Sequence, residues 1–127
     1  MRILLDTTVL VDVLRNRNNR REFLKDLVLA HHTPVTTVLN VAELFAGMRP
    51  GEEAVTEALL KGLVCMGVSE RAARLGGRLK YTWAKRGKTL GLTDTLIAAV
   101  ALEERCALVT DNQRDFPMPD LQSYPLP

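Results

Sequence analysis

Apolar residues along the chain follow two kinds of pattern. Short aliphatic and β-branched runs, each bounded by polar residues, predict buried strands. These strands are expected at 3–5, 35–38, 63–66 and 107–110. Apolar positions that recur every three or four residues between the runs predict helices. These helices are expected at 8–14, 23–28, 39–46, 52–61, 70–86 and 94–102. A last run at 121–124, between prolines, is a candidate edge strand.

Polar and small residues support the boundaries of the last two helices. Ser69 is suited to cap the start of the longest helix, and Gly87 is placed to end it. Thr93 is expected to cap the apolar helix that follows. Because strands alternate with helices, we expect an α/β fold with a mainly parallel sheet and helices on both faces. The length of 127 residues fits a single domain spanning 1–127.

Composition excludes several classes of protein. A hydrophobic share of 46% and a charged share of 25% are ordinary for a globular chain and exclude a disordered, fibrous or membrane-spanning one. The N-terminal segment does not resemble a signal peptide, so a cytoplasmic location is expected. Cys65 and Cys106 lie in separate apolar runs without metal-ligand spacing, and both are expected to be buried, reduced thiols.

Charge is unevenly distributed, although the net charge is only +2. Between Arg71 and Lys88 there are seven basic residues and no acidic one. A second basic cluster lies between Arg15 and Arg21. Such clusters are suited to a polyanion, but each is also compatible with an ordinary solvated helix face.

Polar residues follow two of the predicted strands. Asp6 comes directly after the first strand, and the segment 110–112 comes at the end of the fourth. In parallel sheets, ligands bind beyond the carboxyl ends of the strands. This edge of the sheet is therefore the expected site.

Each candidate acid also has a structural interpretation. Asp6 could simply cap the helix that follows it. Asp94 lies in the first turn of a predicted helix, where the helix dipole stabilises a carboxylate. Glu43 lies at the edge of an apolar helix face beside small residues, which leave its carboxylate room to reach a shared cavity.

Taken together, the acids indicate a metal site. Carboxylates that share a cavity repel one another unless a cation neutralises them. Oxygen ligands without a histidine or cysteine partner favour Mg²⁺ or Mn²⁺ over zinc, and His31 and His32 resemble surface residues. A divalent ion held in this way is suited to phosphodiester hydrolysis.

Four segments of the chain resemble, in order, the motifs of the PIN domain, and most closely the VapC-type toxins of bacterial and archaeal toxin–antitoxin pairs. The segments are Leu5–Asp12, Val41–Leu44, Leu92–Ala99 and Leu108–Phe116. Together they span nearly the whole chain.

This resemblance implies a three-layer α/β/α sandwich with a short parallel sheet. It also implies endoribonuclease activity that depends on Mg²⁺ or Mn²⁺. Asp6, Glu43 and Asp94 match the first three acids of the family and are expected to be catalytic and to bind the metal. Thr110 matches the hydroxyl residue that orders the site. The implied partners are an RNA substrate, a cognate antitoxin and a second copy of the chain in a homodimer.

The fourth acidic position departs from the family pattern. Asn112 stands where the family often has Asp or Asn, and it carries no charge. Asp111 and Asp115 flank it, and we expect Asn112 and Asp115 to complete the catalytic set, with Asp111 as the alternative. Three firm acids are expected to hold one metal ion tightly and a second only with RNA bound. Asp12 is interpreted as an ion-pair or capping partner of nearby arginines.

Three other interpretations remain open. The same chemistry would serve a DNA or flap nuclease, although such enzymes usually carry additional elements. A phosphatase-like hydrolase that uses Asp6 as nucleophile typically needs a second aspartate two residues on, where this chain has Thr8. The main alternative is a catalytically weak PIN-like module that binds RNA or protein. With the family resemblance, the 71–88 helix is expected to contact the RNA backbone, and three large side chains are candidate antitoxin contacts: Phe45, Met48 and Trp83.

Overall fold

The computed structural model, which describes all 127 residues, contains a single sheet of four parallel strands in the order β3-β2-β1-β4. The strands are β1 (Arg2–Leu5), β2 (Thr33–Thr37), β3 (Val64–Met66) and β4 (Ala107–Val109). β1 lies between β2 and β4, and its register pairs Leu4 with Val35 on one side and with Leu108 on the other. The predicted parallel sheet is therefore confirmed.

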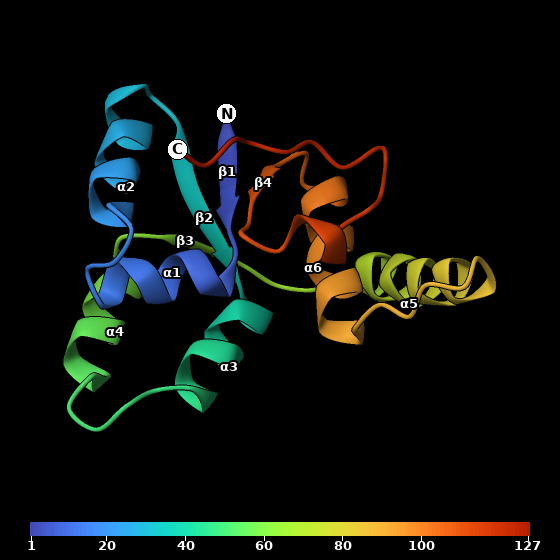
Figure 1. The fold of residues 1–127 in the computed structure, drawn as a ribbon, viewed down its shortest axis with the longest axis horizontal. Helices are drawn as coiled ribbons and strands as arrows, with labels where there is room; N and C mark the ends of the chain where they lie inside the picture. The colour runs from blue at the N-terminus through green and yellow to red at the C-terminus, as the bar shows by residue number, and fades with distance from the viewer.

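Six α-helices and one short 3₁₀ helix surround this sheet (Figure 1). They are α1 (Thr7–Leu14), α2 (Arg20–Leu29), α3 (Val38–Ala46), α4 (Glu53–Lys61), α5 (Glu70–Lys85), α6 (Leu92–Glu103) and η1 (Gln113–Asp115). Helices α1, α2 and α4 lie on one face of the sheet, and α5 and α6 lie on the other. Helix α3 lies beyond the carboxyl ends of the strands and contacts both α1 and α6. This is the expected three-layer α/β/α arrangement.

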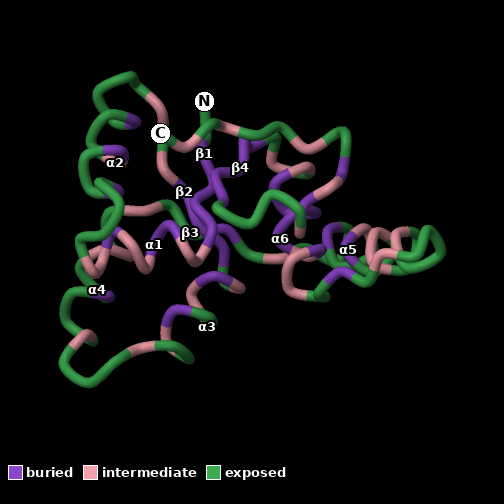
Figure 2. The backbone as a smooth tube through the Cα atoms, in the orientation of Figure 1, coloured by how far each residue is buried: buried purple, intermediate pink, exposed green.

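Alternate residues of β1 and β4 pack into two separate hydrophobic cores, because successive side chains of a strand point to opposite faces. Ile3 and Leu5 pack with the buried residues of α1 and α2, whereas Leu4 packs with those of α6. Figure 2 shows the buried chain concentrated in β1, β2, β4 and α6. Strands that are buried on both faces are read from the sequence as continuous apolar runs, as those at 3–5 and 107–109 are.

The second helical layer depends on a close approach between α5 and α6. Gly76 of α5 lies against Leu96, and a Cβ atom at this glycine would lie 2.7 Å from Leu96 Cδ2 and 3.0 Å from Leu96 Cα. The missing side chain therefore lets the two helices pack closely. This contact fixes the position of α6, which begins at the candidate site.

Four local expectations need correction. Val38, expected in a strand, is the first residue of α3. The helix starts there because the Thr37 hydroxyl accepts hydrogen bonds from the N–H groups of Leu39 and Asn40 and so caps it. Thr93 does not cap α6, which follows Gly91 and begins at Leu92. Cys65 is exposed on the edge strand β3, and only Cys106 is buried; both are free thiols.

The run at 121–124 forms a single parallel bridge, from Ser123 to Leu108, rather than a strand. Leu108 exchanges main-chain hydrogen bonds with Gln122 and Tyr124 on either side of this bridge. Of the six helices, none is both long enough and apolar enough to cross a membrane.

Candidate functional site

The candidate site lies where the strand order reverses. The chain passes from β1 outward to β2 and β3 and then returns to place β4 on the other side of β1. In open parallel sheets, this switch point is where ligands bind beyond the carboxyl ends of the strands. Asp6 follows β1 and Thr110 follows β4, and the Asp6 N–H donates to the Val109 carbonyl at 3.0 Å.

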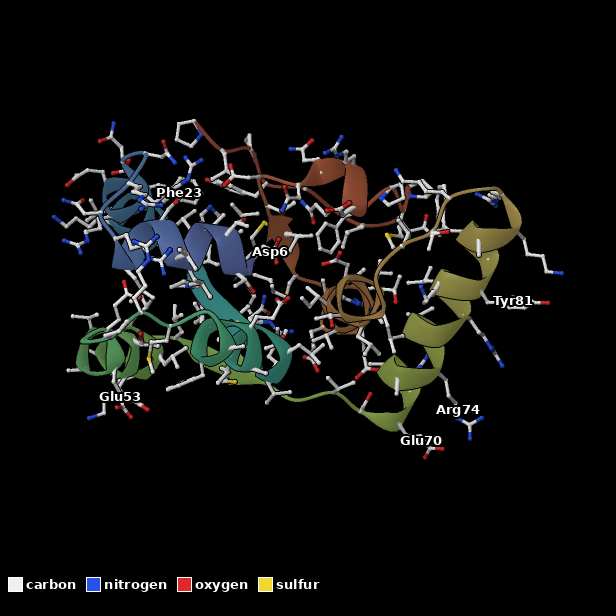
Figure 3. The ribbon with its side chains drawn as sticks, turned by 60° about the horizontal axis from the view of Figure 1, so that its bottom comes forward. Asp6, Phe23, Glu53, Glu70, Arg74 and Tyr81 are labelled. Atoms are coloured by element: carbon white, nitrogen blue, oxygen red, sulfur yellow. The ribbon has the colours of Figure 1, made fainter.

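Asp6 is a buried carboxylate at the start of α1. Its Oδ1 accepts a hydrogen bond from the Thr7 N–H at 2.9 Å, so it caps the helix, and its Oδ2 accepts one from the Thr110 hydroxyl at 2.7 Å. Burial raises the pKa of Asp6, while the bonds from Thr110 and Thr7 act in the opposite direction. Asp6 therefore both caps a helix and presents a fixed carboxylate (Figure 3).

Glu43 is held at the site by a relay of hydrogen bonds that starts at the cap of α3. The Thr37 hydroxyl donates to Asn40 Oδ1 at 2.7 Å, and Asn40 Nδ2 donates to the Thr7 hydroxyl oxygen at 3.0 Å. The Thr7 hydroxyl then donates to Glu43 Oε1 at 2.6 Å. Asn40 is fully buried, and each group before Glu43 both accepts and donates a hydrogen bond.

Sequence reasoning did not find the roles of Thr7 and Asn40. The relay joins the end of β1 to α3 through residues more than thirty positions apart, which no local pattern reveals. The available signal was an asparagine three residues after the threonine that caps α3, a position from which a side chain reaches back to the cap.

Asp94 lies in the first turn of α6 and faces the same space. Its pKa is raised from 3.8 to about 6, first by burial and then by the charges of Asp6, Asp115 and Glu43. The charges of Glu43 and Asp115 thus reach both Asp6 and Asp94, so four carboxyl groups meet here, from the cap of α1, from α3, from α6 and from η1. The three acids expected at the site are brought together.

The residues around the fourth position separate into different environments. Asp115, at the end of η1, raises the pKa of both Asp6 and Asp94 and so belongs to the acidic group. Asp111 instead forms an ion pair with Arg20, in which Arg20 Nη2 lies 2.9 Å from Asp111 Oδ1. The Asn112 main chain donates to the Thr110 hydroxyl oxygen at 3.0 Å, and its side chain lines a hollow beside the site.

The chemistry of this acidic group fits Mg²⁺ or Mn²⁺. The donors are carboxylate oxygens without histidine or cysteine, and their mutual repulsion is what a divalent cation relieves. As the side chains stand, no three of them are drawn together at metal-binding distance. Asp6 and Glu43 are instead held by the hydroxyl groups of Thr110 and Thr7.

The remaining candidate residues lie elsewhere. Asp12 pairs with Arg20 at 3.6 Å, in agreement with its interpretation as an ion-pair partner. The three large side chains considered as antitoxin contacts are all half-buried: Phe45, Met48 and Trp83. The basic helix is α5, on which Arg71, Arg74, Arg78 and Lys85 are exposed. Arg86 lies over the Trp83 ring, and Lys80 donates to the Leu90 carbonyl.

Comparisons with known proteins agree with this architecture. A family model described as PIN domain matches residues 3–118. Ribonuclease VapC19 of Mycobacterium tuberculosis is 38% identical over 94% of this chain and 96% of its own length. Ribonuclease VapC2 of Haemophilus influenzae is 30% identical over 91% of this chain and 90% of its own.

Solved structures show the same fold. VapBC2 from Rickettsia felis, bound to a DNA fragment from its promoter, superposes with a TM-score of 0.87 at 24% identity and covers 98% of both chains. VapBC from Salmonella typhimurium bound to DNA gives a TM-score of 0.83 at 23% identity, over 98% of this chain and 97% of that one. The topology, the acids gathered at the switch point and these relatives lead to one conclusion: the chain belongs to the PIN-domain family, among its VapC members.

Proposed function

We propose that this protein is a divalent-metal-dependent endoribonuclease that hydrolyses RNA phosphodiester bonds as the toxin of a toxin–antitoxin pair. The observation that carries the proposal is the group of four carboxyl groups at the switch point of the sheet, in a chain 38% identical to a protein named Ribonuclease VapC19. Asp6, Glu43 and Asp94 are the proposed metal ligands, with Asp115 as the fourth acid. Mg²⁺ is the proposed ion, and Mn²⁺ has the same ligand preferences.

The proposed mechanism assigns a task to each side chain. A bound ion supplies an activated water and neutralises charge on the phosphate. Thr110 fixes the orientation of the Asp6 carboxylate, and Thr7 fixes that of Glu43. Because Asp94 has a pKa near 6, it is charged at neutral pH but protonated in mild acid, so metal affinity should fall below about pH 6.

Cleavage of RNA by the purified chain tests the proposal. The wild-type protein is incubated with structured RNA and Mg²⁺, with and without EDTA, beside Asp6→Asn, Asp94→Asn and the control Asp26→Asn, which replaces an exposed acid on α2. We expect only the wild type and the control to cleave the RNA. We also expect EDTA to abolish this cleavage. Cleavage that survives chelation or loss of Asp94 would contradict the carboxylate-metal mechanism. Binding of RNA without any cleavage would favour the alternative of a PIN-like binding module.

A matched DNA substrate distinguishes the two classes of nuclease. We expect no cleavage of DNA oligonucleotides with the sequence of a cleaved RNA. Efficient cleavage of the DNA would favour the rival function of a DNA or flap nuclease.

The proposed partners and setting follow from the same relatives. The solved neighbours include toxin–antitoxin complexes, so we propose that an antitoxin binds and inhibits this chain. We also propose that residues 1–127 form one domain, that it pairs as a homodimer, and that it acts in the cytoplasm on RNA. Co-purification of this chain with the product of the neighbouring reading frame, together with loss of RNA cleavage in that complex, is the test of the antitoxin.

A further inference from the structure

A polar hollow of about 730 Å³ lies directly beside the acidic group. One wall is the segment from Thr110 to Arg114, which follows β4 and includes the first two residues of η1, and the other is the C-terminal segment Pro125–Pro127. Arg20, at the start of α2, also lines it. The volume is in the range of small-ligand sites, and the lining is polar apart from the C-terminal segment.

Arg20 is a buried guanidinium with unused hydrogen-bonding capacity. It is only 6% exposed, and it is oriented by ion pairs to Asp111 at 2.9 Å and Asp12 at 3.6 Å. Its Nε is buried and faces Asp12, while Nη1 donates to the Asn18 carbonyl and Nη2 to Asp111. A guanidinium carries five N–H donors, so after these bonds the second N–H groups of Nη1 and Nη2 are the ones left for a ligand with acceptor oxygens. Phosphate oxygens have the geometry that this group recognises.

The opposite part of the lining carries two primary amides. The side chains of Asn112 and Gln113 are exposed and make no hydrogen bond within the chain. Each amide offers a donor and an acceptor side by side, which is the pattern that base edges present. Arg114, next in the chain, is exposed and forms no ion pair, so its charge is also free.

The hollow and the acids share a residue. Thr110 lines the hollow, and its hydroxyl lies 2.7 Å from Asp6 Oδ2. A molecule in the hollow is therefore next to the carboxylates. A neutral amide at position 112 has a clear use on this surface, whereas it would add no charge to a metal site.

We propose that this hollow binds one nucleotide of the RNA substrate beside the bond that is cut. Arg20 and Arg114 contact its phosphate, and the amides of Asn112 and Gln113 read its base. Asn112 is thereby assigned to substrate selection instead of metal binding. The inference rests on the proposed ribonuclease function and specifies how that site chooses where to cut.

The first test is the sequence preference at the cut. An RNA library randomised around a cleaved site is treated with the wild type, with Asn112→Ala/Gln113→Ala and with the control Gln122→Ala, an exposed glutamine outside this hollow. Sequencing of the cut ends is expected to show a nucleotide preference at a position flanking the cut. This preference should fall about tenfold in the double variant and stay unchanged in the control. An unchanged preference in a double variant that still cleaves would overturn the inference and leave the ribonuclease function intact.

The second test does not depend on catalysis. A short 2′-O-methyl RNA, which is not cleaved, is titrated into ¹⁵N-labelled wild-type protein in EDTA. The side-chain amide signals of Asn112 and Gln113 are expected to shift, and that of Gln122 is not. Failure of the two amides to respond, in a protein that cleaves RNA, would refute the nucleotide site. If the amides shift but no RNA is ever cleaved, the proposed function fails while the binding site stands.

Discussion

Hydroxyl groups, rather than further charges, hold two of the acids: Asp6, which follows β1, and Glu43, which lies on α3. Thr110 donates to Asp6 at 2.7 Å and Thr7 donates to Glu43 at 2.6 Å. A hydrogen bond to the ionised form favours that form, which opposes the effect of burial on the pKa of Asp6. The hydroxyl groups thus keep a buried carboxylate available as a ligand.

Removal of the Thr110 hydroxyl should impair RNA cleavage without unfolding the chain. Thr110→Val keeps the shape of the side chain but cannot donate to Asp6, so we expect kcat/KM to fall about 10- to 100-fold. Thr110→Ser keeps the hydroxyl and should retain most of the activity. Equal losses in the two variants would mean that shape, not the hydrogen bond, is what matters at this position.

The half-buried Asp94 should destabilise the metal-free protein at neutral pH. Its folded-state pKa of about 6 exceeds the unfolded value of 3.8, so the folded chain binds more protons between these values and its stability falls as pH rises through that window. In EDTA at pH 7.5, Asp94→Asn should be more stable than the wild type. The expected gain is about 1 kcal/mol after discounting for partial exposure.

Urea unfolding at two pH values measures this effect. The gain from Asp94→Asn should disappear below about pH 3, where the wild-type carboxyl group is largely protonated in both states. The same difference between the two proteins at both pH values would contradict this account of Asp94.

The sequence allowed the three principal acids to be predicted, because Asp6 follows a strand, Asp94 begins a helix and Glu43 lies within a helix, and all three elements are strongly patterned. It did not allow the choice between Asp111 and Asp115. That choice depends on a contact with Arg20, ninety-one positions away, which draws Asp111 into an ion pair. Asn40 was missed for a similar reason, since its function exists only where α3 meets the end of β1.

At the scale of elements, the packing of α5 on α6 determines where Asp94 lies. Gly76 permits this packing, because a Cβ there would lie 2.7 Å from a Leu96 side-chain atom and 3.0 Å from its Cα. The neighbouring Gly77 has nothing within 4 Å of an added Cβ. The two adjacent glycines are therefore suited to a paired substitution test, because one lies in close contact with α6 and the other has free space around it.

Alanine at these two glycines should have opposite effects on stability. Gly76→Ala forces α5 and α6 apart and should lower the free energy of unfolding by about 1–3 kcal/mol. Gly77→Ala should raise it by about 0.5–1 kcal/mol, since alanine is the better helix former. Thermal or urea unfolding of both variants is the measurement. A Gly76→Ala protein as stable as the wild type would show that the contact is looser than described.

Element types could be predicted from apolar periodicity, whereas several boundaries could not. Val38 continues an apolar β-branched run, yet the Thr37 hydroxyl caps the helix one residue earlier than that run suggests. At α6, the side chain of Thr93 suggested a cap, but the helix begins at Leu92 without any side-chain cap. The exposure of Cys65 reflects the edge position of β3, which depends on strand order rather than on the local sequence.

At the scale of the whole molecule, positive charge gathers on the side of the second helical layer. A second hollow of about 550 Å³ lies between α5 and the end of α6, and its lining includes one acid, Glu103, and four arginines: Arg71, Arg74, Arg78 and Arg105. Arg74 pairs with Glu70 on the exposed surface (Figure 3), while the other three form no ion pair. This part of α5 is where we expect the RNA backbone to run.

Loss of two of these arginines should weaken RNA binding without changing the chemistry. For Arg71→Ala/Arg78→Ala we expect a higher KM and an unchanged kcat. The slope of the logarithm of the RNA-binding constant against the logarithm of the salt concentration should become shallower by about one unit for each lost phosphate contact. Lys61→Ala, at the end of α4, is the control for a general loss of positive charge. The prediction is wrong if the double variant and the control bind RNA with the same salt dependence.

The most direct test of the account is a calorimetric titration of Mn²⁺ into the protein without RNA. We predict one tightly bound ion per chain, at least tenfold weaker binding in Asp6→Asn and Asp94→Asn, a smaller loss in Asp115→Asn, and unchanged binding in Asp111→Asn and Asp26→Asn. Two tight ions per chain would contradict the single-metal expectation. Tight binding that survives the loss of both Asp6 and Asp94 would contradict the central claim that these carboxylates hold the metal.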